Sequence, residues 1–498
     1  MKSKLSNKGY VIMKDEYSDK ELKKIKKELN VSPYSPYQSK FSAPPSFPIY
    51  LESKRKLYLP RYWSLDNLGP PEKFCINEGT SIDIKFNGSL RPVQEEAVSA
   101  YMKNCYPEYG GGILCLGCGF GKTIISLYLL SILKKKTLVI VHKEFLLNQW
   151  IERIKAFLPD AQVGRIQAKT FDIAGKDIVI GMLQSLSMKE FEENAFDSFG
   201  TVIVDEAHHI SSEVFSRALP KVSFKYTIGL TATPNRADGL QKVFEWFLGP
   251  IVYRSKGGKQ HNVFVKVIQI DDTNESYCKV EEGYDGKPIT SRMINNVANY
   301  IPRTSVIIRE VQKIMEEPGR KMLILSDRRD HLKYIHTQLT EIGFDVGFYV
   351  GGMKQKDLDI SETKPIILGT FSMSSEALDI PELNTLFMTT PKSNIEQSVG
   401  RILRKTHEIR PLIIDIKDNF RPFASQCNKR KTFYKKCKYE IYDMKVKPNE
   451  MEEILEKNKN IHNMTCNIID DLNETETTNS KKKGEQIKIE ECMFSDDD

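Results

Sequence analysis

Residues 112–130 read GILCLGCGFGKTIISLYLL, so that an apolar strand, a glycine-rich turn and an apolar helix follow one another directly. Glycines allow the backbone N–H groups of such a turn to close around phosphate oxygens, and the start of the helix adds positive potential. Lys122 can reach the β and γ phosphates of a nucleotide, and the Thr123 hydroxyl can bind Mg²⁺. We therefore predict a site for ATP and Mg²⁺ made by Gly117, Cys118, Gly119, Phe120, Gly121, Lys122 and Thr123.

The turn has two unusual features. Leu116 stands where the strict pattern of a phosphate-binding loop has glycine, five residues before Gly121. Cys115 and Cys118 form a CxxC pair, but no second cysteine pair lies nearby in the sequence. We expect both cysteines to be small packing residues of the strand and the turn.

A pair of acidic residues follows another apolar run, TVIV at 201–204. This pair, Asp205 and Glu206, comes 83 residues after Lys122 (205 − 122) and opens the sequence DEAH. A carboxylate at the carboxyl end of a parallel strand faces the nucleotide crevice of such a sheet. We expect Asp205 to hold Mg²⁺ through water, and Glu206 to orient or deprotonate the water that attacks the terminal phosphate.

Short apolar runs, each followed by a helical segment, occur in two groups along the chain. They begin at residues 112, 137, 177, 201 and 227, and again at 321, 349, 365, 384 and 411. Buried parallel strands that alternate with helices produce this pattern. The fold class is therefore α/β, with two tandem doubly wound parallel sheets.

Changes in composition divide the chain. We predict an N-terminal accessory domain at 1–84, a first α/β domain at 85–255, a polar linker or insertion at 256–302, a second α/β domain at 303–442 and a disordered polar tail at 443–498. The accessory domain is rich in proline, tyrosine and lysine and is expected to be partly irregular. The tail has too few apolar residues to fill a core.

The composition favours an intracellular protein with only a weak preference for polyanions. The net charge is +7, because 73 basic residues are nearly offset by 66 acidic ones. The 9 cysteines show no disulfide spacing, so we expect reduced thiols. The longest apolar stretch near the middle, at 124–133, is about half of the roughly 20 residues that a membrane helix needs. No membrane segment is expected.

Six motifs stand in an order that resembles superfamily 2 DEAH-box helicases, whose two domains are RecA-like. They are LRPVQ at 90–94, the phosphate loop, DEAH at 205–208, GLTATP at 229–234, SEALDIP at 375–381 and QSVGRILR at 397–404. Their wording resembles the branch that contains XPB-type repair and transcription helicases, UvsW-type phage helicases and poxvirus transcript-release helicases. The YLPRYW segment and the compact size resemble helicases of large DNA viruses.

The resemblance implies roles in nucleotide chemistry. Arg91 and Gln94 contact adenine, and Glu376 and Asp379 lie near the ribose and the domain interface, although Ala377 replaces the glycine of relatives. Arg401 and Arg404 reach toward the γ phosphate. Three residues apart on one helical face, these arginines can neutralise charge on the transferred phosphoryl group. Residues expected to couple the ATP site to nucleic acid are His208, Thr231, Thr233 and Gln397.

Nucleic-acid contacts are expected where strands end, since helicases of this kind hold the phosphate backbone. The candidates are His142, Lys143, Gln184, Ser185 and Thr370. The stretch NKRKTFYKKCKY at 428–439 interleaves basic and aromatic residues, so it either grips nucleic acid or forms a solvated basic helix.

The expected function is ATP-dependent translocation on nucleic acid, with DNA favoured over RNA and 3′ to 5′ movement implied by the resemblance. Partners would be nucleic acid and RNA polymerase or another transcription or repair assembly; the oligomeric state is not predicted. A viral origin would imply a virion or a cytoplasmic replication site, and a cellular origin the nucleus. Transcript release or DNA repair would be the setting.

Three alternatives stay open at this point. A duplex translocase would displace bound proteins without separating strands. A scaffold would keep the fold as a nucleotide-dependent binding module with little turnover, although Lys122, Glu206 and Arg404 are retained. A restriction-type motor subunit shares the same motifs but needs nuclease and specificity partners.

Overall fold

The computed structural model describes residues 2–33, 46–104, 110–117, 119–192, 194–206, 212–232, 239–255, 262–284, 286–376, 378–405 and 407–448. Within Met1–Val446, which forms one compact unit, the described residues build three larger sheets. The predicted tail lies outside the described residues from 449 onward. No helix in the described part of the chain is long and apolar enough to cross a membrane.

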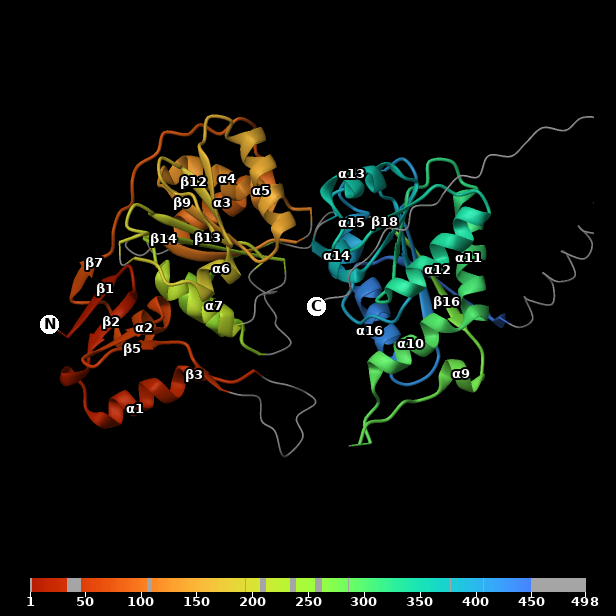
Figure 1. The fold of residues 1–498 in the computed structure, drawn as a ribbon, viewed down its shortest axis with the longest axis horizontal. Coiled ribbons are helices and arrows are strands. Elements are labelled where there is room, and N and C mark those ends of the chain that lie inside the picture. Colours follow the sequence, from red (N-terminus) through yellow and green to blue (C-terminus); the bar gives the residue numbers. More distant parts are fainter. Residues whose placement is uncertain are drawn as a thin grey trace, which may run out of the picture. The chain divides into compact units, whose positions relative to one another are not determined.

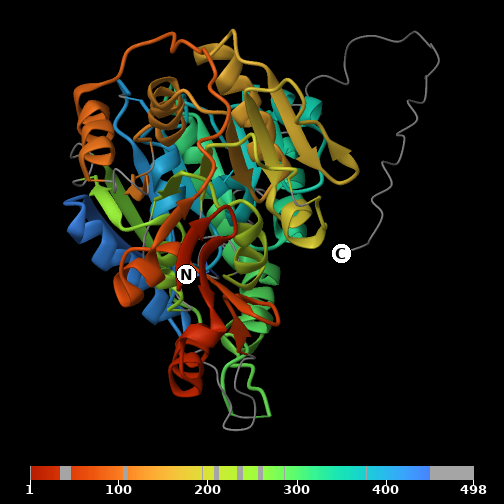
Figure 2. The ribbon, with the colours of Figure 1, turned by 90° about the vertical axis from the view of Figure 1, so that its left-hand side faces the viewer.

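The N-terminal part is more regular than the sequence suggested. Its five-stranded sheet, which is red to orange in Figure 2, has the order β5-β6-β2-β1-β7. Its elements are β1 (Ser3–Ser6), β2 (Gly9–Met13), α1 (Asp19–Glu28), β3 (Asn30–Val31), β4 (Phe47–Pro48), β5 (Leu51–Glu52), β6 (Lys56–Leu59), α2 (Arg61–Leu68) and β7 (Lys73–Cys75). The buried Arg61 of α2 donates to the Lys225 carbonyl at 3.0 Å and to Ser223 Oγ at 3.2 Å, which ties this sheet to the domain that follows.

The first α/β domain contains an eight-stranded sheet in the order β11-β10-β12-β9-β13-β14-β8-β15. The strands are β8 (Gly111–Cys115), β9 (Thr137–Val141), β10 (Val163–Gln167), β11 (Thr170–Phe171), β12 (Ile178–Met182), β13 (Thr201–Val204), β14 (Tyr226–Thr231) and β15 (Ile251–Arg254). Every pairing is parallel except that of β10 with β11. The predicted doubly wound sheet is confirmed.

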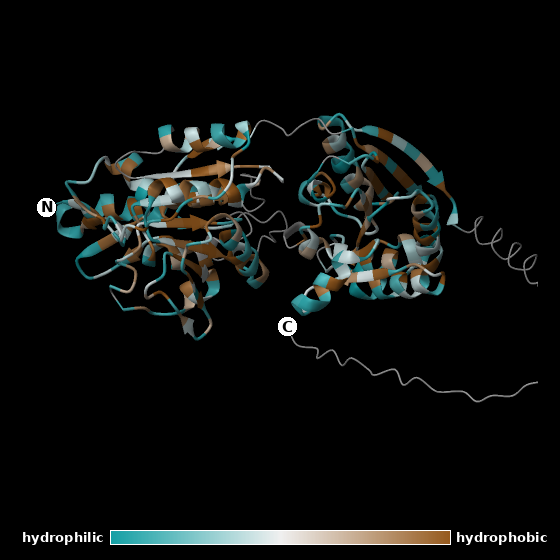
Figure 3. Cartoon of the chain, turned by 90° about the horizontal axis from the view of Figure 1, so that it is seen from above, coloured by the Kyte–Doolittle hydropathy of each residue, from teal (hydrophilic) through white to brown (hydrophobic). Residues whose placement is uncertain are grey.

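Helices cover both faces of this sheet (Figure 1). They are α3 (Pro92–Asn104), α4 (Lys122–Leu133) and α5 (Glu144–Phe157) on one face, and α6 (Leu183–Met188), α7 (Ser212–Ala218) and α8 (Gln241–Leu248) on the other. The central strands are brown in Figure 3 because their residues are mostly apolar, and both of their faces are buried.

The second α/β domain has a seven-stranded sheet with the order β18-β19-β17-β20-β21-β16-β22, and all of its pairings are parallel. The strands are β16 (Phe264–Ile270), β17 (Met322–Leu325), β18 (Val346–Tyr349), β19 (Ile366–Gly369), β20 (Thr385–Met388), β21 (Leu412–Asp418) and β22 (Glu440–Val446). The helices are α9 (Glu275–Cys278), α10 (Thr290–Asn299), α11 (Ile301–Met315), α12 (Arg329–Glu341), α13 (Gln355–Thr363), α14 (Phe371–Glu376), α15 (Glu396–Arg401) and α16 (Phe423–Lys436).

Two predicted boundaries are corrected. The supposed linker at 256–302 contains β16, which pairs with β21 on one side and β22 on the other. Its sequence FVKVIQI does not stand out as a strand because polar, glycine-bearing or acidic segments flank it. Strand β22 also extends to Val446, four residues into the predicted tail (446 − 442).

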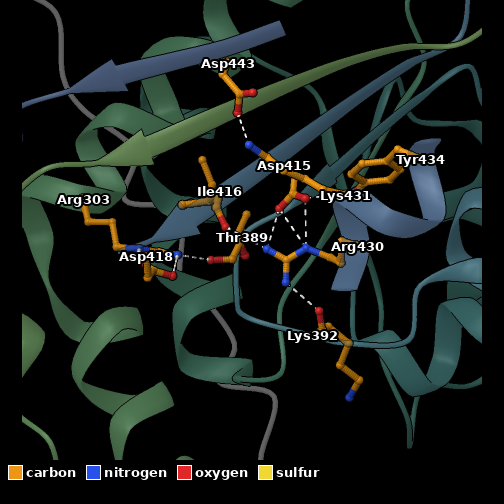
Figure 4. A network of polar contacts seen from close by, with 10 residues as sticks. All are labelled: Arg303, Thr389, Lys392, Asp415, Ile416, Asp418, Arg430, Lys431, Tyr434 and Asp443. Atoms are coloured by element: carbon orange, nitrogen blue, oxygen red, sulfur yellow. Dashed lines mark hydrogen bonds and ion pairs between the residues drawn. The ribbon is translucent and has the colours of Figure 1, made fainter. Parts of the chain in front are cut away.

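Two buried arginines brace the second domain through the aspartates of β21 (Figure 4). Arg303 donates from Nε and Nη2 to Asp418 at 2.7 and 2.9 Å, and Nη2 also donates to the Thr389 carbonyl at 2.7 Å. Arg430 donates from Nη2 to Asp415 at 2.7 Å and from Nη1 to the Lys392 carbonyl at 2.5 Å. The loop after β20 is therefore held by hydrogen bonds from the two arginines to its backbone carbonyls.

This arrangement removes Arg430 and Tyr434 from the possible nucleic-acid contacts of the stretch at 428–439. Arg430 is 2% exposed and Tyr434 is 0% exposed, and the Tyr434 hydroxyl donates to Asp415 at 2.9 Å. Neither side chain can contact a nucleic-acid strand, because both are part of the protein core. The basic and aromatic residues alternate here because α16 presents one face to the sheet and the other to solvent.

Candidate active site

The phosphate loop lies between β8 and α4, as predicted. Gly119 and Gly121 have φ angles of +73° and +88°, a region that favours glycine. A Cβ atom at Gly121 would also lie 2.3 Å from Gln94 Nε2. The last glycine of the loop is thus required by both its backbone conformation and its closest neighbour.

Lys122 and Glu206 form an ion pair between Nζ and Oε1. Lys122 is the first residue of α4, and Glu206 follows β13 with a φ of +48°. This left-handed conformation is uncommon for a residue with a side chain, and residues strained in this way tend to cluster at functional sites. The strand end and the helix start therefore bring the two predicted catalytic groups together.

Asp205 is 6% exposed at the end of β13. Its Oδ2 accepts a hydrogen bond from Trp150 Nε1 at 2.9 Å, and its Oδ1 accepts one from the Glu206 backbone N–H at 2.9 Å. Burial raises the pKa of Asp205 and the Glu206 carboxylate raises it further, whereas Lys122 and the two hydrogen bonds act in the opposite direction. A divalent cation beside Asp205 would favour its charged form.

Arg91 and Gln94 support the phosphate loop. Arg91 Nη2 donates to the carbonyls of Gly119 at 3.2 Å and Phe120 at 2.5 Å, and Gln94 Nε2 donates to Phe120 at 2.9 Å. These bonds connect the start of α3 to the loop. The predicted adenine contact stays a prediction.

The second domain contributes arginines from α15 and the residues after it. Arg401 is 8% exposed and donates from Nη1 to the Leu378 carbonyl at 2.7 Å. Arg404 forms an ion pair with Asp379, whose Oδ2 also accepts from Arg153 Nη2 at 2.7 Å. The carboxylate of Asp379 thus lies between two guanidinium groups.

A pocket of about 410 Å³ brings these groups together. Its lining includes the predicted residues Gly117, Gly119, Gly121, Lys122, Thr123, Asp205, Glu206, Asp379, Gln397, Arg401 and Arg404. The lining thus supplies an ammonium group, guanidinium groups, a helix start, a hydroxyl and carboxylates, which are groups that bind a magnesium-bound triphosphate. The pocket therefore fits ATP and Mg²⁺ chemically.

Sequence reasoning missed several residues of this site. Trp150, Gln149 and Arg153 all come from α5, and Ser255 accepts a hydrogen bond from the Gly117 N–H at 3.0 Å. The spacing of Gln149 and Arg153, one helical turn apart, places them on the same face as Leu146. Only the fold shows that this face lines the pocket.

The expected nucleic-acid contacts lie where parallel strands end. His142 and Lys143 follow β9, Gln184 and Ser185 follow β12, and Thr370 follows β19. Ser185 Oγ accepts from the Ala168 N–H at 3.0 Å, and Thr370 Oγ1 lies 3.4 Å from Ser372 Oγ. Their contact with nucleic acid stays a prediction.

The remaining predicted residues are only partly described. Thr231 ends β14 and is buried, and its carbonyl accepts from the Leu116 N–H at 2.8 Å. Glu376 is the last residue of α14, and its side chain lies outside the described part. Cys118, His208 and Thr233 also lie outside the described residues. Cys115 is buried, and no metal-ligand cluster is found among the residues described.

Comparison with known proteins shows the family. A model described as "Type III restriction enzyme, res subunit" matches residues 87–236. A "Putative ATP-dependent RNA helicase" of Acanthamoeba polyphaga mimivirus is 34% identical over 518 residues, which span 100% of this chain and 99% of the relative. A protein of the same name from African swine fever virus is 28% identical over 382 residues, 70% of this chain and 73% of the relative.

Among solved structures, "S. cerevisiae Dbp5 bound to RNA and ADP BeF3" is similar with a TM-score of 0.49 and 10% identity, over 75% of this chain and 94% of that one. The relationship to the mimivirus protein extends along the whole chain. The chain belongs to the superfamily 2 helicases, in the family of ATP-dependent helicases found in large DNA viruses.

Proposed function

We propose that this helicase binds ATP with Mg²⁺, moves 3′ to 5′ along a DNA strand and separates it from its complement. The observation that carries the proposal is the pocket shared by Lys122, Asp205, Glu206 and Arg404. The polarity and the preference for DNA are supported by resemblance to the XPB-type branch.

Each group in the pocket has a task in hydrolysis. Lys122 would hold the phosphates, while Thr123 and Asp205 would hold Mg²⁺. Bound Mg²⁺ offsets charge on the phosphate oxygens. Glu206 accepts a proton as water bonds to the γ phosphorus and the bond to the ADP oxygen breaks. Arg401 and Arg404 neutralise the charge that develops on the transferred group.

Binding and release of ATP then change the grip on the strand. His142, Lys143, Gln184, Ser185 and Thr370 hold the phosphate backbone in this proposal. His208, Thr231, Thr233 and Gln397 transmit the state of the nucleotide to them. Nucleic-acid binding is therefore expected to speed hydrolysis.

RNA is the second candidate substrate, because both curated viral relatives are named RNA helicases. The same family relationship supports a viral origin, with action at the virion or a cytoplasmic replication site. Transcript release beside RNA polymerase, or repair, is the proposed setting. DNA and RNA strands must both be offered in the test.

Strand displacement tests the proposal. Labelled duplexes of DNA and of RNA, each with a 3′ or a 5′ single-stranded extension, are mixed with protein, ATP and Mg²⁺. Release of the labelled strand from the 3′-extended DNA alone supports the full proposal. Release from the RNA duplex supports RNA, the second candidate, as the substrate. ATP hydrolysis with displacement of a bound protein but no strand release would contradict helicase action and identify a duplex translocase.

A further inference from the structure

The carboxylate of Asp205 accepts two hydrogen bonds from described residues, one from the Trp150 side chain and one from the adjoining Glu206 backbone N–H. The indole is 1% exposed and lies in the core between α5 and the sheet. Its Nε1 to Oδ2 distance is 2.9 Å, so the bond is well formed and shielded from water.

A core tryptophan needs a hydrogen-bond acceptor, but a neutral carbonyl would satisfy it at lower desolvation cost. Here the acceptor is the carboxylate that the proposed function assigns to Mg²⁺. The other carboxylate oxygen accepts from the Glu206 N–H, so the two donors together fix the rotation of the Asp205 side chain. Each oxygen retains a lone pair for a water on the cation.

We propose that Trp150 is a positioning residue for Mg²⁺: its indole N–H fixes the Asp205 carboxylate in the orientation that receives the hydrated cation. Groups that hydrogen-bond to metal ligands commonly set metal affinity by orienting those ligands. The proposal rests on the proposed function only in assigning Mg²⁺ to Asp205.

The hydrogen bond between Trp150 and Asp205 also links helix α5 to the ATP pocket. Leu146, Gln149 and Arg153 of the same helix line the ATP pocket, and the helix begins directly after His142 and Lys143. Trp150 is buried on this helix and connects it to the strand end that carries Asp205. The position of α5 and the orientation of the carboxylate are therefore linked by one hydrogen bond.

The test measures cation binding without turnover. Full-length protein saturated with ADP is titrated with Mn²⁺, and free Mn²⁺ is followed by electron paramagnetic resonance. Trp150→Phe removes the N–H donor, and replacement of Trp150 by benzothienylalanine removes the donor while keeping the ring shape. Trp63→Phe is the matched control, because Trp63 is also buried, at 4% exposure, but belongs to the N-terminal core.

We expect both Trp150 replacements to weaken Mn²⁺ binding roughly tenfold, and Trp63→Phe to leave it unchanged. Melting temperatures close to wild type for the benzothienylalanine protein would separate this effect from loss of packing. Unchanged Mn²⁺ affinity in that folded protein overturns the positioning role and leaves the proposed function standing. If the wild-type protein saturated with ADP binds no Mn²⁺, both the positioning role of Trp150 and the proposed function are overturned.

Discussion

The Lys122 ammonium is paired with the Glu206 carboxylate in the phosphate site, and each side chain is 16% exposed. In the proposed function, Lys122 receives the phosphates and Glu206 activates water, so this ion pair joins the two groups that the proposal assigns to hydrolysis. We propose that the phosphates of ATP compete with Glu206 for the Lys122 ammonium, which would free Glu206 to activate water.

Glu206→Gln should separate binding from hydrolysis. The change keeps the shape of the side chain but removes both the base and the charge that competes for Lys122. We expect turnover to fall by roughly 10²–10⁴-fold, while ATP binds at least as tightly as in wild type. Phosphate release and binding of a fluorescent ATP analogue measure the two effects. Hydrolysis near the wild-type rate would exclude Glu206 as the base.

Arg404→Ala should slow hydrolysis by roughly 10³-fold if its guanidinium stabilises the transition state. Its neighbour Lys405 supplies the control, because Lys405 is 48% exposed and pairs with Glu382 outside the pocket. Steady-state hydrolysis at saturating ATP compares Arg404→Ala with Lys405→Ala. Equal rates in the two variants would remove Arg404 from the chemistry.

Arg430→Met should destabilise the protein without weakening nucleic-acid binding. Removing one partner of the buried Arg430–Asp415 pair leaves an uncompensated charge, at a cost of about 3–5 kcal/mol. Denaturant unfolding measures the free energy of unfolding, and strand binding is measured below the transition. Lys429→Ala, an exposed change on the same helix, is the stability control. Weaker binding with unchanged stability would restore the nucleic-acid interpretation of α16.

The second domain should lose stability as the pH falls. Burial, together with the nearby Arg303 charge, lowers the pKa of His331 from 6.5 to about 3. Between pH 6.5 and about pH 3, His331 therefore binds a proton in the unfolded state but not in the folded state. The contribution of neutral His331 to the free energy of unfolding is fully present above pH 6.5. It is lost on acidification, by up to about 1.4 kcal/mol per pH unit.

Thermal melts of wild type and His331→Gln at pH 7 and pH 5 test this expectation. The variant should show a smaller decrease in melting temperature between the two conditions, because it has no imidazole at this position. His336→Gln, on the same helix but only half-buried, should stay closer to wild type. Equal pH dependence in wild type and His331→Gln would show that His331 does not titrate in this range.

The sequence predicted the central strands because both of their faces are buried. β9 and β12, for example, are apolar at every position or nearly so. The alternating pattern of β16 and the mostly exposed residues of β22 gave no such signal. Strands of this kind become recognisable only when their partners are known.

The phosphate loop and the DEAH segment could be predicted because each motif is local in sequence. The bond between Trp150 and Asp205 joins residues 55 positions apart, and no short pattern encodes it. For Arg430 and Tyr434 the composition was misleading, since a buried ion pair and a phosphate contact use the same side chains. Only packing distinguishes the two.

ATP hydrolysis with and without nucleic acid tests the proposed motor most directly. Purified wild-type protein and Lys122→Ala are compared alone and with single-stranded DNA, duplex DNA or RNA. We predict that a nucleic acid raises wild-type turnover well above its basal rate, with DNA most effective, and that Lys122→Ala stays inactive throughout. Wild-type turnover that no nucleic acid stimulates would contradict the motor and favour a nucleotide-dependent scaffold.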